Sequence, residues 1–343
     1  MVEPQSSPAS SPAATTVEAP DSLLTPGARV FVAGHRGLVG SAIRRRLDAE
    51  GFDVLVRTRD ELDLRNSADT ADFLAQTRPD AVVLAAAKVG GIMANSTYPV
   101  QFLEDNLRIQ LSVISGSYAA GVGRLLFLGS SCIYPKLAPQ PIQESSILTG
   151  PLEKTNQAYA LAKIAGIEQV NAYRSQYGAS YISAMPTNLY GPGDNFDLAS
   201  SHVLPALIRR FHEAKQAGAA SVTLWGTGTP LREFLHVDDL ARACVFLLEQ
   251  PYERVREASC DGLLNVGAGE DLEIRELADI IRQATGCAAK MVFDPSKPDG
   301  TPRKLLDIGR MRGLGWAPEI SLREGVAEFC RWFAEHQTTA ATI

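Results

Sequence analysis

Residues 29–47 read Arg-Val-Phe-Val-Ala-Gly-His-Arg-Gly-Leu-Val-Gly-Ser-Ala-Ile-Arg-Arg-Arg-Leu. The first five residues form a short apolar run, typical of a strand buried in a parallel sheet, and the last seven have helical periodicity. Between them, Gly34, Gly37 and Gly40 are spaced as G-x-x-G-x-x-G. The first glycine permits a tight turn, the second lets backbone approach a pyrophosphate, and the third lets the helix pack against the strand. The stretch therefore predicts the opening of a dinucleotide-binding fold.

After this opening, expected strands and helices alternate with one another through the first half of the chain. Apolar runs predict strands at 52–57, 79–87, 124–129 and 181–185, with helical segments between them. Such alternation predicts an α/β fold with a doubly wound parallel (Rossmann) sheet, whose ligands bind beyond the carboxyl ends of the strands. We expect a cofactor domain over 27–192 plus about 236–266. A smaller, interleaved substrate domain is expected over 193–235 and 267–335.

The second expected strand ends in cations. NAD-dependent enzymes usually carry an acid there, whereas this chain has Arg57 and Arg59, with Arg36 in the glycine turn. A guanidinium matches a ribose 2′-phosphate in a bidentate way, so these residues favour NADP(H). Solvated surface charge is the alternative reading of the three arginines. Asp63 and Leu64 are expected to flank the adenine.

Composition limits the partners. The chain has 343 residues and a net charge of −6, and its pI is near 5.5. A nucleic-acid binder would show a basic surplus, so none is expected, and any phosphate must be held by local cations. The five cysteines are scattered and do not cluster with histidines. A reducing compartment and no metal site are expected.

The first 26 residues are rich in Pro, Ser, Ala and Thr. We expect a disordered tail over 1–26 without the basic and apolar regions of a signal peptide. No apolar run reaches about 18 residues, so no membrane span is expected. These features favour a cytoplasmic protein.

Proton-transfer groups follow the strand at 124–129. Ser130 and Cys132 come directly after it, and Tyr159 and Lys163 lie four residues apart on an expected helix, so they share a face. An ammonium about 4 Å from a phenol would lower the phenol pKa from about 10 by roughly three units. A Tyr-x-x-x-Lys pair alone is better explained as a pair on the surface of a helix. With the glycine turn and a strand-terminal serine, it indicates a carbonyl reductase.

Five segments carry a family resemblance. They read Gly-His-Arg-Gly-Leu-Val-Gly, Ala-Ala-Lys-Val-Gly-Gly-Ile, Leu-Gly-Ser-Ser-Cys-Ile-Tyr-Pro-Lys, Met-Pro-Thr-Asn-Leu-Tyr-Gly-Pro and Arg-Glu-Phe-Leu-His-Val-Asp-Asp, at 34–40, 86–92, 128–136, 185–192 and 232–239. The chain resembles, over nearly all of 28–335, the extended short-chain dehydrogenase/reductase family, which acts on nucleotide sugars. The likeness is greatest to the branch that converts GDP-4-keto-6-deoxy-D-mannose to GDP-L-fucose by NADPH-dependent 3,5-epimerisation and 4-reduction.

The resemblance implies residue roles. Ser130, Tyr159 and Lys163 would form the reductase triad, and Cys132 and His202 the acid/base pair of the epimerase. The chemistry agrees, because epimerisation beside a ketone passes through an enolate that hydroxyl donors stabilise. A free thiol has a pKa near 8.5, which needs only modest lowering, and an imidazole titrates near neutrality. Taken by themselves, Cys132 could equally be a small buried hydrophobe and His202 a helix-terminal residue bonded to backbone.

The remaining contacts are also carried over from the resemblance. The cofactor would be NADP(H), held by Gly34, Arg36, Gly37, Leu38, Val39, Gly40, Arg57, Arg59, Asp63, Leu64, Ala86, Leu128, Gly129, Ser130, Tyr159, Lys163, Pro186, Thr187, Asn188, Leu189 and His202. The GDP-sugar would be held by Ser131, Asn188, Arg210, Trp225, Arg232 and Asp299, the last in a cationic loop over 297–303. Trp225 is a candidate for stacking on a base or sugar, although an isolated tryptophan is more often a core residue.

Other readings stay open. A nucleotide-sugar 4-epimerase or 4,6-dehydratase of the same fold would retain NAD, but dehydratases generally place acids where this chain has Ser131 and Cys132. A non-catalytic scaffold on this fold would be favoured by loss of Tyr159 or Lys163, and both are present. The sequence leaves the role of Lys88 open. The helical segment at 100–120 and the one holding Tyr159 are apolar on more than one face, which predicts a homodimer or burial in a thick layer.

Overall fold

The core of the protein is a six-stranded parallel sheet. The computed structural model describes residues 24–198, 201–297 and 299–340. Across the six-stranded sheet the strand order is β10-β5-β4-β3-β1-β2, and every adjacent pair of strands is parallel. The bounds are β1 Arg29–Ala33, β2 Asp53–Leu55, β3 Ala81–Leu84, β4 Arg124–Leu128, β5 Tyr181–Pro186 and β10 Leu263–Val266. The doubly wound parallel sheet expected from the sequence is confirmed.

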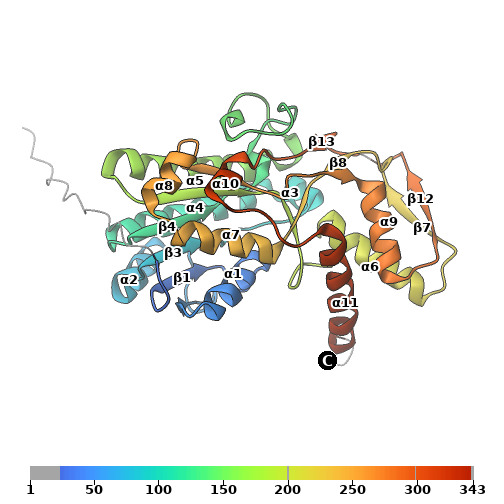
Figure 1. Cartoon of the computed structure of the whole chain (residues 1–343), viewed down its shortest axis with the longest axis horizontal. Coiled ribbons are helices and arrows are strands. Elements are labelled where there is room, and N and C mark those ends of the chain that lie inside the picture. Colours follow the sequence, from blue (N-terminus) through green and yellow to red (C-terminus); the bar gives the residue numbers. More distant parts are fainter. Residues whose placement is uncertain (1–23, 199–200, 298, 341–343) are drawn as a thin grey trace, which may run out of the picture.

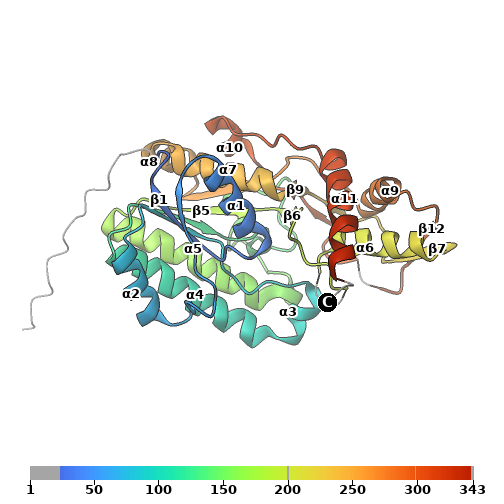
Figure 2. The ribbon, with the colours of Figure 1, turned by 90° about the horizontal axis from the view of Figure 1, so that it is seen from below.

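Helices cover both faces of this sheet. On one face lie α1, α7 and α8, and on the other α2, α4 and α5, as Figure 2 shows. The first three helices are α1 Leu38–Ala49, α7 Val237–Glu249 and α8 Tyr252–Ala258, and the other three are α2 Ser67–Thr77, α4 Pro99–Ala119 and α5 Gln157–Tyr177. Because both faces are covered, all residues of β3, β4, β5 and β10 are buried. This explains their continuous apolar runs.

The glycine turn joins β1 to α1 as the spacing predicts. Gly34 has φ +93°, and a Cβ there would lie 2.7 Å from the Ala86 backbone. A Cβ on Gly40 would collide with the Gly34 carbonyl, and Gly37 is the residue that precedes α1. Side chains at Gly34 and Gly40 would thus push the turn away from the strand and helix that it connects.

A second group of elements packs beside the sheet, at the right of Figure 1. It comprises α6 Val203–Gln216, β7 Ser221–Trp225, β8 Leu231–Arg232, β11 Leu272–Glu273, α9 Ile274–Thr285, β12 Lys290–Asp294, β13 Arg303–Lys304 and α11 Leu322–Ala340. The strands form two small sheets, β11-β8-β13 and β12-β7. Leu207, Phe211, Leu277 and Phe329 are among the residues of a separate core under these elements.

The chain passes between the two groups more than once. After β8, the strand β9 (Phe234–His236) pairs with β6 (Asn188–Tyr190) and leads into α7 on the main sheet. The segment then supplies β10, which pairs in parallel with β5 at the edge of the main sheet. The short helices α3 (Ile92–Thr97) and α10 (Gly309–Leu314) complete the fold. The exact domain boundaries stay a prediction.

Some element ends differ from expectation. Strand β2 covers only Asp53–Leu55 and β3 only Ala81–Leu84, so both are shorter than the expected strands at 52–57 and 79–87. Of the tail expected over 1–26, residues 1–23 lie outside the described part. Leu24 is buried among core residues, so packing begins earlier than residue 27. No helix in the described ranges is both long and apolar enough to cross a membrane.

Candidate active site

The carboxyl end of β4 supplies two of the predicted site residues. A single 3-10 turn, Ser131–Ile133, follows the strand, and Ser130 precedes it. The Ser130 Oγ accepts the backbone N–H of Cys132 at 3.3 Å. Ser131, predicted to touch substrate, is buried in this turn. The local sequence therefore fixes a hydroxyl and a thiol two residues apart at the edge of the sheet where ligands bind.

Helix α5 brings Tyr159 and Lys163 to the same place. Tyr159 is 9% exposed and Lys163 is 3% exposed. The Lys163 Nζ lies 5.9 Å from the centre of the Tyr159 ring and donates to the Leu128 carbonyl at 2.7 Å. Ser130 lies near enough to the Tyr159 hydroxyl to lower the pKa of the phenol. The three residues predicted as a reductase triad therefore lie in one cluster, in which Tyr159 and Lys163 are buried and Ser130 is half-buried.

The electrostatics of this cluster differ from the expectation that Lys163 lowers the pKa of Tyr159. Burial raises the Tyr159 pKa well above 10, the nearby Cys132 raises it further, and Ser130 lowers it. Burial also lowers the pKa of Lys163 to about 7. The expectation is wrong for this structure because the Lys163 ammonium binds the Leu128 carbonyl, while desolvation disfavours the charged form of both groups.

The thiol of Cys132 faces a different environment. Cys132 is half-buried and a free cysteine. Its Sγ lies 3.2 Å from the Asn156 amide nitrogen and 3.7 Å from the Lys304 Nζ. His202 directly precedes α6, where surrounding protein atoms and then the Lys304 charge lower its pKa. Lys304 is therefore close to both members of the predicted acid/base pair.

Sequence reasoning missed Lys304 and Asn156. Lys304 is 172 residues from Cys132 along the chain, and it lies one residue beyond the cationic loop singled out at 297–303. Asn156 directly precedes α5, where no motif marks it. The fold alone brings these two side chains to the thiol.

The predicted nucleoside and diphosphate residues cluster at the second group of elements. Trp225 is 56% exposed, which excludes the core reading of this residue. The cationic groups of Arg210 and Lys297 lie 5.6 and 5.7 Å from the centre of its ring system. Asp299 accepts the backbone N–H and the hydroxyl of Thr227 at 2.7 and 2.9 Å. An aromatic surface flanked by cations suits a flat base or sugar attached to phosphates.

Arg232 and Asn188 are held by the backbone near this cluster. Burial lowers the pKa of Arg232 and the Asp299 charge raises it. The Asn188 amide donates to the Glu233 carbonyl at 2.7 Å, which leaves its oxygen as the acceptor. Thr187, from the same segment after β5, is buried. The segment after β5 therefore carries fixed polar groups at the edge where ligands bind.

The cations predicted to hold a 2′-phosphate lie around the glycine turn. Arg36, Arg57 and Arg59 are exposed, and within the described residues none forms an ion pair with a carboxylate. Hydrogen bonds from Thr58, and then the charges of Arg57 and Arg36, lower the pKa of Glu61, so both cations are near one point. The Arg57 guanidinium lies 5.0 Å from the centre of the Phe73 ring. Exposed cations beside this turn fit the phosphates of NADP.

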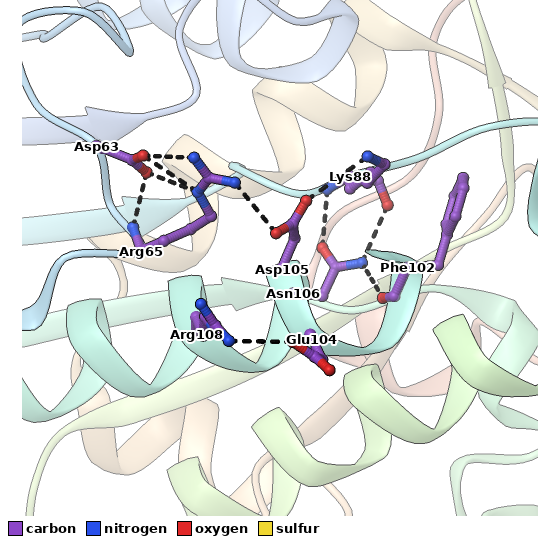
Figure 3. Close-up of polar contacts among 8 residues, drawn as sticks. All are labelled: Asp63, Arg65, Lys88, Phe102, Glu104, Asp105, Asn106 and Arg108. Carbon is purple, nitrogen blue, oxygen red and sulfur yellow. Dashed lines mark hydrogen bonds and ion pairs between the residues drawn. The ribbon is translucent and has the colours of Figure 1, made fainter. Parts of the chain in front are cut away.

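A polar network ties the predicted adenine residue to the neighbouring loop, as Figure 3 shows. Arg65 donates to both oxygens of Asp63, at distances down to 2.6 Å, and this bond lowers the pKa of Asp63 to about 2. Arg65 also reaches Asp105 at 3.2 Å, and Asp105 lies 3.6 Å from the Lys88 Nζ. The Asn106 side chain holds the Lys88 backbone at 2.8 and 3.0 Å.

This network gives Lys88 a structural role that the sequence left open. It fastens the loop after β3 to the loop after β2 through α4, which carries Asp105 and Asn106. The two loops flank the position that the sequence assigns to the adenosine half of the cofactor. Within the described part of the chain, no group of three or more His, Cys, Asp or Glu residues could hold a metal ion.

Comparison with known proteins identifies the family. Residues 30–267 match the model of the NAD dependent epimerase/dehydratase family. The chain belongs to this family. It is 57% identical over 310 residues to GDP-L-fucose synthase 1 of Arabidopsis thaliana, which covers 90% of this chain and 94% of the relative. It is 55% identical over 312 residues to GDP-L-fucose synthase of Escherichia coli K12, covering 90% and 97% of the two chains.

A solved structure agrees with these matches. The GDP-mannoheptose C4 reductase MlghC of Campylobacter jejuni, solved with NADP bound, has a TM-score of 0.83 and 32% identity to this chain. The alignment covers 91% of this chain and 99% of that one. The extended short-chain dehydrogenase/reductase resemblance, drawn from five short segments, is therefore confirmed over nearly the whole length.

Proposed function

We propose that this protein converts GDP-4-keto-6-deoxy-D-mannose to GDP-L-fucose, by epimerisation at C3 and C5 and NADPH-dependent reduction at C4. The observation that carries the proposal is the free Cys132 thiol, which lies near Ser130 and Tyr159: the Cys132 backbone N–H donates to Ser130, and both residues act on the Tyr159 pKa. A simple carbonyl reductase needs only the hydroxyls and Lys163, whereas inversion of a carbon beside the ketone needs a further base and acid. Relatives that share 55–57% identity bear the name GDP-L-fucose synthase, which supports the same activity.

The epimerisation step uses both parts of the site. The Ser130 and Tyr159 hydroxyls donate hydrogen bonds to the C4 ketone oxygen, where the negative charge of the enolate develops. Cys132 and His202 exchange the proton of the neighbouring carbon, one removing it from one face and the other returning a proton to the opposite face. Each inversion thus breaks one C–H bond and forms another, with no net change in oxidation state.

The reduction step uses the buried cluster. Tyr159 delivers its hydroxyl proton to the C4 oxygen, and Ser130 keeps that oxygen within hydrogen-bond reach. Lys163, with a pKa of about 7, exchanges protons near neutral pH and is placed to hold the ribose of the cofactor. Bound NADPH supplies the hydride for C4. The glycine turn and the exposed Arg36, Arg57 and Arg59 are the residues that would hold its phosphates.

Substrate identity is proposed from the second cluster. Trp225, Arg210, Lys297 and Arg232 combine an exposed ring with cations that can bind a nucleoside diphosphate. A 4-epimerase or 4,6-dehydratase retaining NAD is less well supported, because the chain presents three exposed arginines to the 2′ position and a thiol after Ser131. The proposal includes a homodimer, supported by the exposed Leu111 and Leu161 on the neighbouring helices α4 and α5, and a location in the cytoplasm, which rests on the sequence alone.

Isotope exchange tests the proposal. Incubated with GDP-4-keto-6-deoxy-D-mannose in heavy water without NADPH, the wild-type protein should incorporate deuterium at C3 and C5. Cys132→Ser should lose this exchange by about 10³-fold, whereas Tyr159→Phe should mainly lose NADPH oxidation, by a similar factor. NMR and mass spectrometry measure the exchange, and absorbance at the NADPH band measures the reduction.

Two outcomes would contradict the proposal. The absence of any exchange by the wild-type protein would remove the epimerase activity, and equal effects of the two variants on both readouts would remove the division of roles. Replacing GDP with dTDP or UDP in the keto sugar should lower kcat/KM strongly. Equal rates with all three nucleotides would overturn the assignment of GDP.

A further inference from the structure

Lys304 occupies a position that the surrounding backbone fixes from several sides. It ends β13, whose two residues pair in parallel with β8. Two residues later, the Leu306 N–H donates to the buried Glu233 carboxylate at 3.0 Å, and the Leu305 N–H between them donates to Gln140 at 2.9 Å. A lysine on a fixed strand end can hold its ammonium at one place with less loss of entropy than one on an open loop.

The ammonium of Lys304 has no acid to neutralise it within the described residues. The adjacent Arg303 pairs with Asp271 at 2.6 Å, and Arg232, opposite Lys304 in the small sheet, feels the charge of Asp299. No ion pair of the described residues joins Lys304 to a carboxylate. Its nearest recorded partner is the Cys132 Sγ, at 3.7 Å.

The same charge acts on His202. Lys304 is the only charged group that shifts the pKa of His202 within the described residues, and it does so in the same direction as burial, downward. The groups that act on the thiol are Lys304, the Asn156 amide and the phenol of Tyr159. One cation therefore acts on both side chains that the proposed function uses for proton exchange.

We propose that Lys304 is a positioning residue for epimerisation, whose ammonium favours the thiolate of Cys132 and makes a protonated His202 a readier proton donor. A cation beside a sulfur favours its deprotonated form, and beside an imidazole it disfavours the protonated form. Both effects promote proton exchange at carbons next to the ketone. The role of Lys304 in that exchange rests on the proposed function, but its effect on the thiol does not.

Alkylation of the free protein tests the effect on the thiol. At about pH 7 the rate of reaction of Cys132 with iodoacetamide follows its thiolate fraction, so Lys304→Gln should slow it by about tenfold. Lys304→Arg keeps the charge and should stay within about twofold of the wild type. Mass spectrometry of the Cys132 peptide gives the rate, and the half-buried Cys260 in the same sample serves as a reference thiol.

Lys136→Gln is the matched control. Lys136 lies four residues from Cys132, but its Nζ pairs with Glu153 at 2.6 Å, so its charge is already neutralised. This variant makes the same change in net charge and should leave the alkylation rate unchanged. An unchanged rate in Lys304→Gln, or an equal slowing in Lys136→Gln, would overturn the proposal.

Deuterium exchange then tests the role in epimerisation. With GDP-4-keto-6-deoxy-D-mannose in heavy water, Lys304→Gln should lower the exchange rate at saturating substrate by about tenfold, and Lys304→Arg should restore most of it. A lysine that only bound the diphosphate would raise KM and leave the saturated rate and the alkylation unchanged, which would refute the proposal. The two readouts can also disagree. If alkylation is slower in Lys304→Gln but the wild type shows no deuterium exchange, the effect of Lys304 on the Cys132 thiol is confirmed and the proposed function is refuted.

Discussion

Burial dominates one half of the proposed active site and a placed charge the other: the reductase side is the half around Tyr159 and Lys163, and the epimerase side is the half around Cys132 and Lys304. Tyr159 and Lys163 are 9% and 3% exposed, and burial is the largest influence on the pKa of each. Cys132 and Lys304 are half-buried, and there a fixed cation lies 3.7 Å from the thiol. Desolvation therefore sets the proton affinities on the reductase side, and a placed charge is available on the epimerase side. Substitutions that alter burial or charge should affect the two sides selectively.

Lys163→Met should have the largest effect. It removes the amine proposed to hold the cofactor ribose in the cluster with Tyr159, and should lower NADPH oxidation by at least about 100-fold, with a smaller effect on deuterium exchange. Comparison of the two rates in one preparation measures the difference. A parallel loss of both would mean that the buried cluster also controls the thiol side.

The same variant should show a pH-dependent gain in stability. The pKa of Lys163 is about 7 in the folded protein and near 10.5 in the unfolded chain. Between these values the unfolded chain binds more protons, so the wild type gains stability as pH rises, by about 2–3 kcal/mol from pH 6 to pH 9 through this group alone. Lys163→Met lacks this term. The stability of Lys163→Met relative to the wild type should therefore be highest at pH 6 and should fall as the pH rises to 9, as measured by urea unfolding.

Glu233→Gln should affect the epimerase side by loosening the segment that carries Lys304. The Glu233 carboxylate is fully buried and accepts the N–H groups of Gly269 at 2.8 Å and Leu306 at 3.0 Å. An amide at this position would turn an N–H group toward one of these donors, at a cost of about 2 kcal/mol. Urea unfolding measures this cost, and deuterium exchange should fall more than NADPH oxidation.

The control for this variant is Glu257→Gln. The Glu257 side chain is 73% exposed and lies 4.0 Å from Arg256, so its change should stay within about 0.5 kcal/mol. If the urea midpoint of Glu233→Gln equals that of the wild type, the Glu233 carboxylate does not anchor the segment that carries Lys304.

Much of the fold and of the reductase side follows from local sequence. The G-x-x-G-x-x-G spacing and the apolar runs predict the sheet, and the four-residue spacing predicts that Tyr159 and Lys163 share a face. The expected fall in the Tyr159 pKa is wrong, because it counted the attraction of the Lys163 ammonium and left out the desolvation of both groups. The Leu128 carbonyl, 35 residues from Lys163, takes the ammonium instead. Burial and long-range hydrogen bonds are properties of the folded chain.

The epimerase side was predicted only in part. Cys132 follows a recognisable strand, and the family resemblance supplied His202, but the residue that lies near both is on a strand of two residues. A strand so short has no periodicity to detect, and its position depends on pairing with β8 and on the buried Glu233. Trp225 shows the same limit, since its exposure depends on where β7 ends.

Arg57→Ala extends the contrast to the cofactor and should have the smallest effect. Like Lys304, Arg57 is a cation without a carboxylate partner among the described residues, held by the Val56 carbonyl and the Phe73 ring. Loss of its contact to a 2′-phosphate should raise the KM for NADPH by about tenfold, or about 1.4 kcal/mol, and leave the KM for NADH unchanged. Steady-state kinetics with both cofactors measure this.

Salt should reduce the effect of Arg57→Ala, because an exposed charge is screened and the Debye length falls to about 3 Å at 1 M. The effect of Lys163→Met should persist in the same buffer, because buried groups are screened much less. Arg108→Ala is the control, since the exposed Arg108 pairs with Glu104 at 3.0 Å on α4. Equal increases of KM for NADPH and NADH in Arg57→Ala would show that the guanidinium does not contact the 2′-phosphate. If the effect of Arg57→Ala on the KM for NADPH does not change with salt, Arg57 behaves as a buried charge rather than as an exposed one.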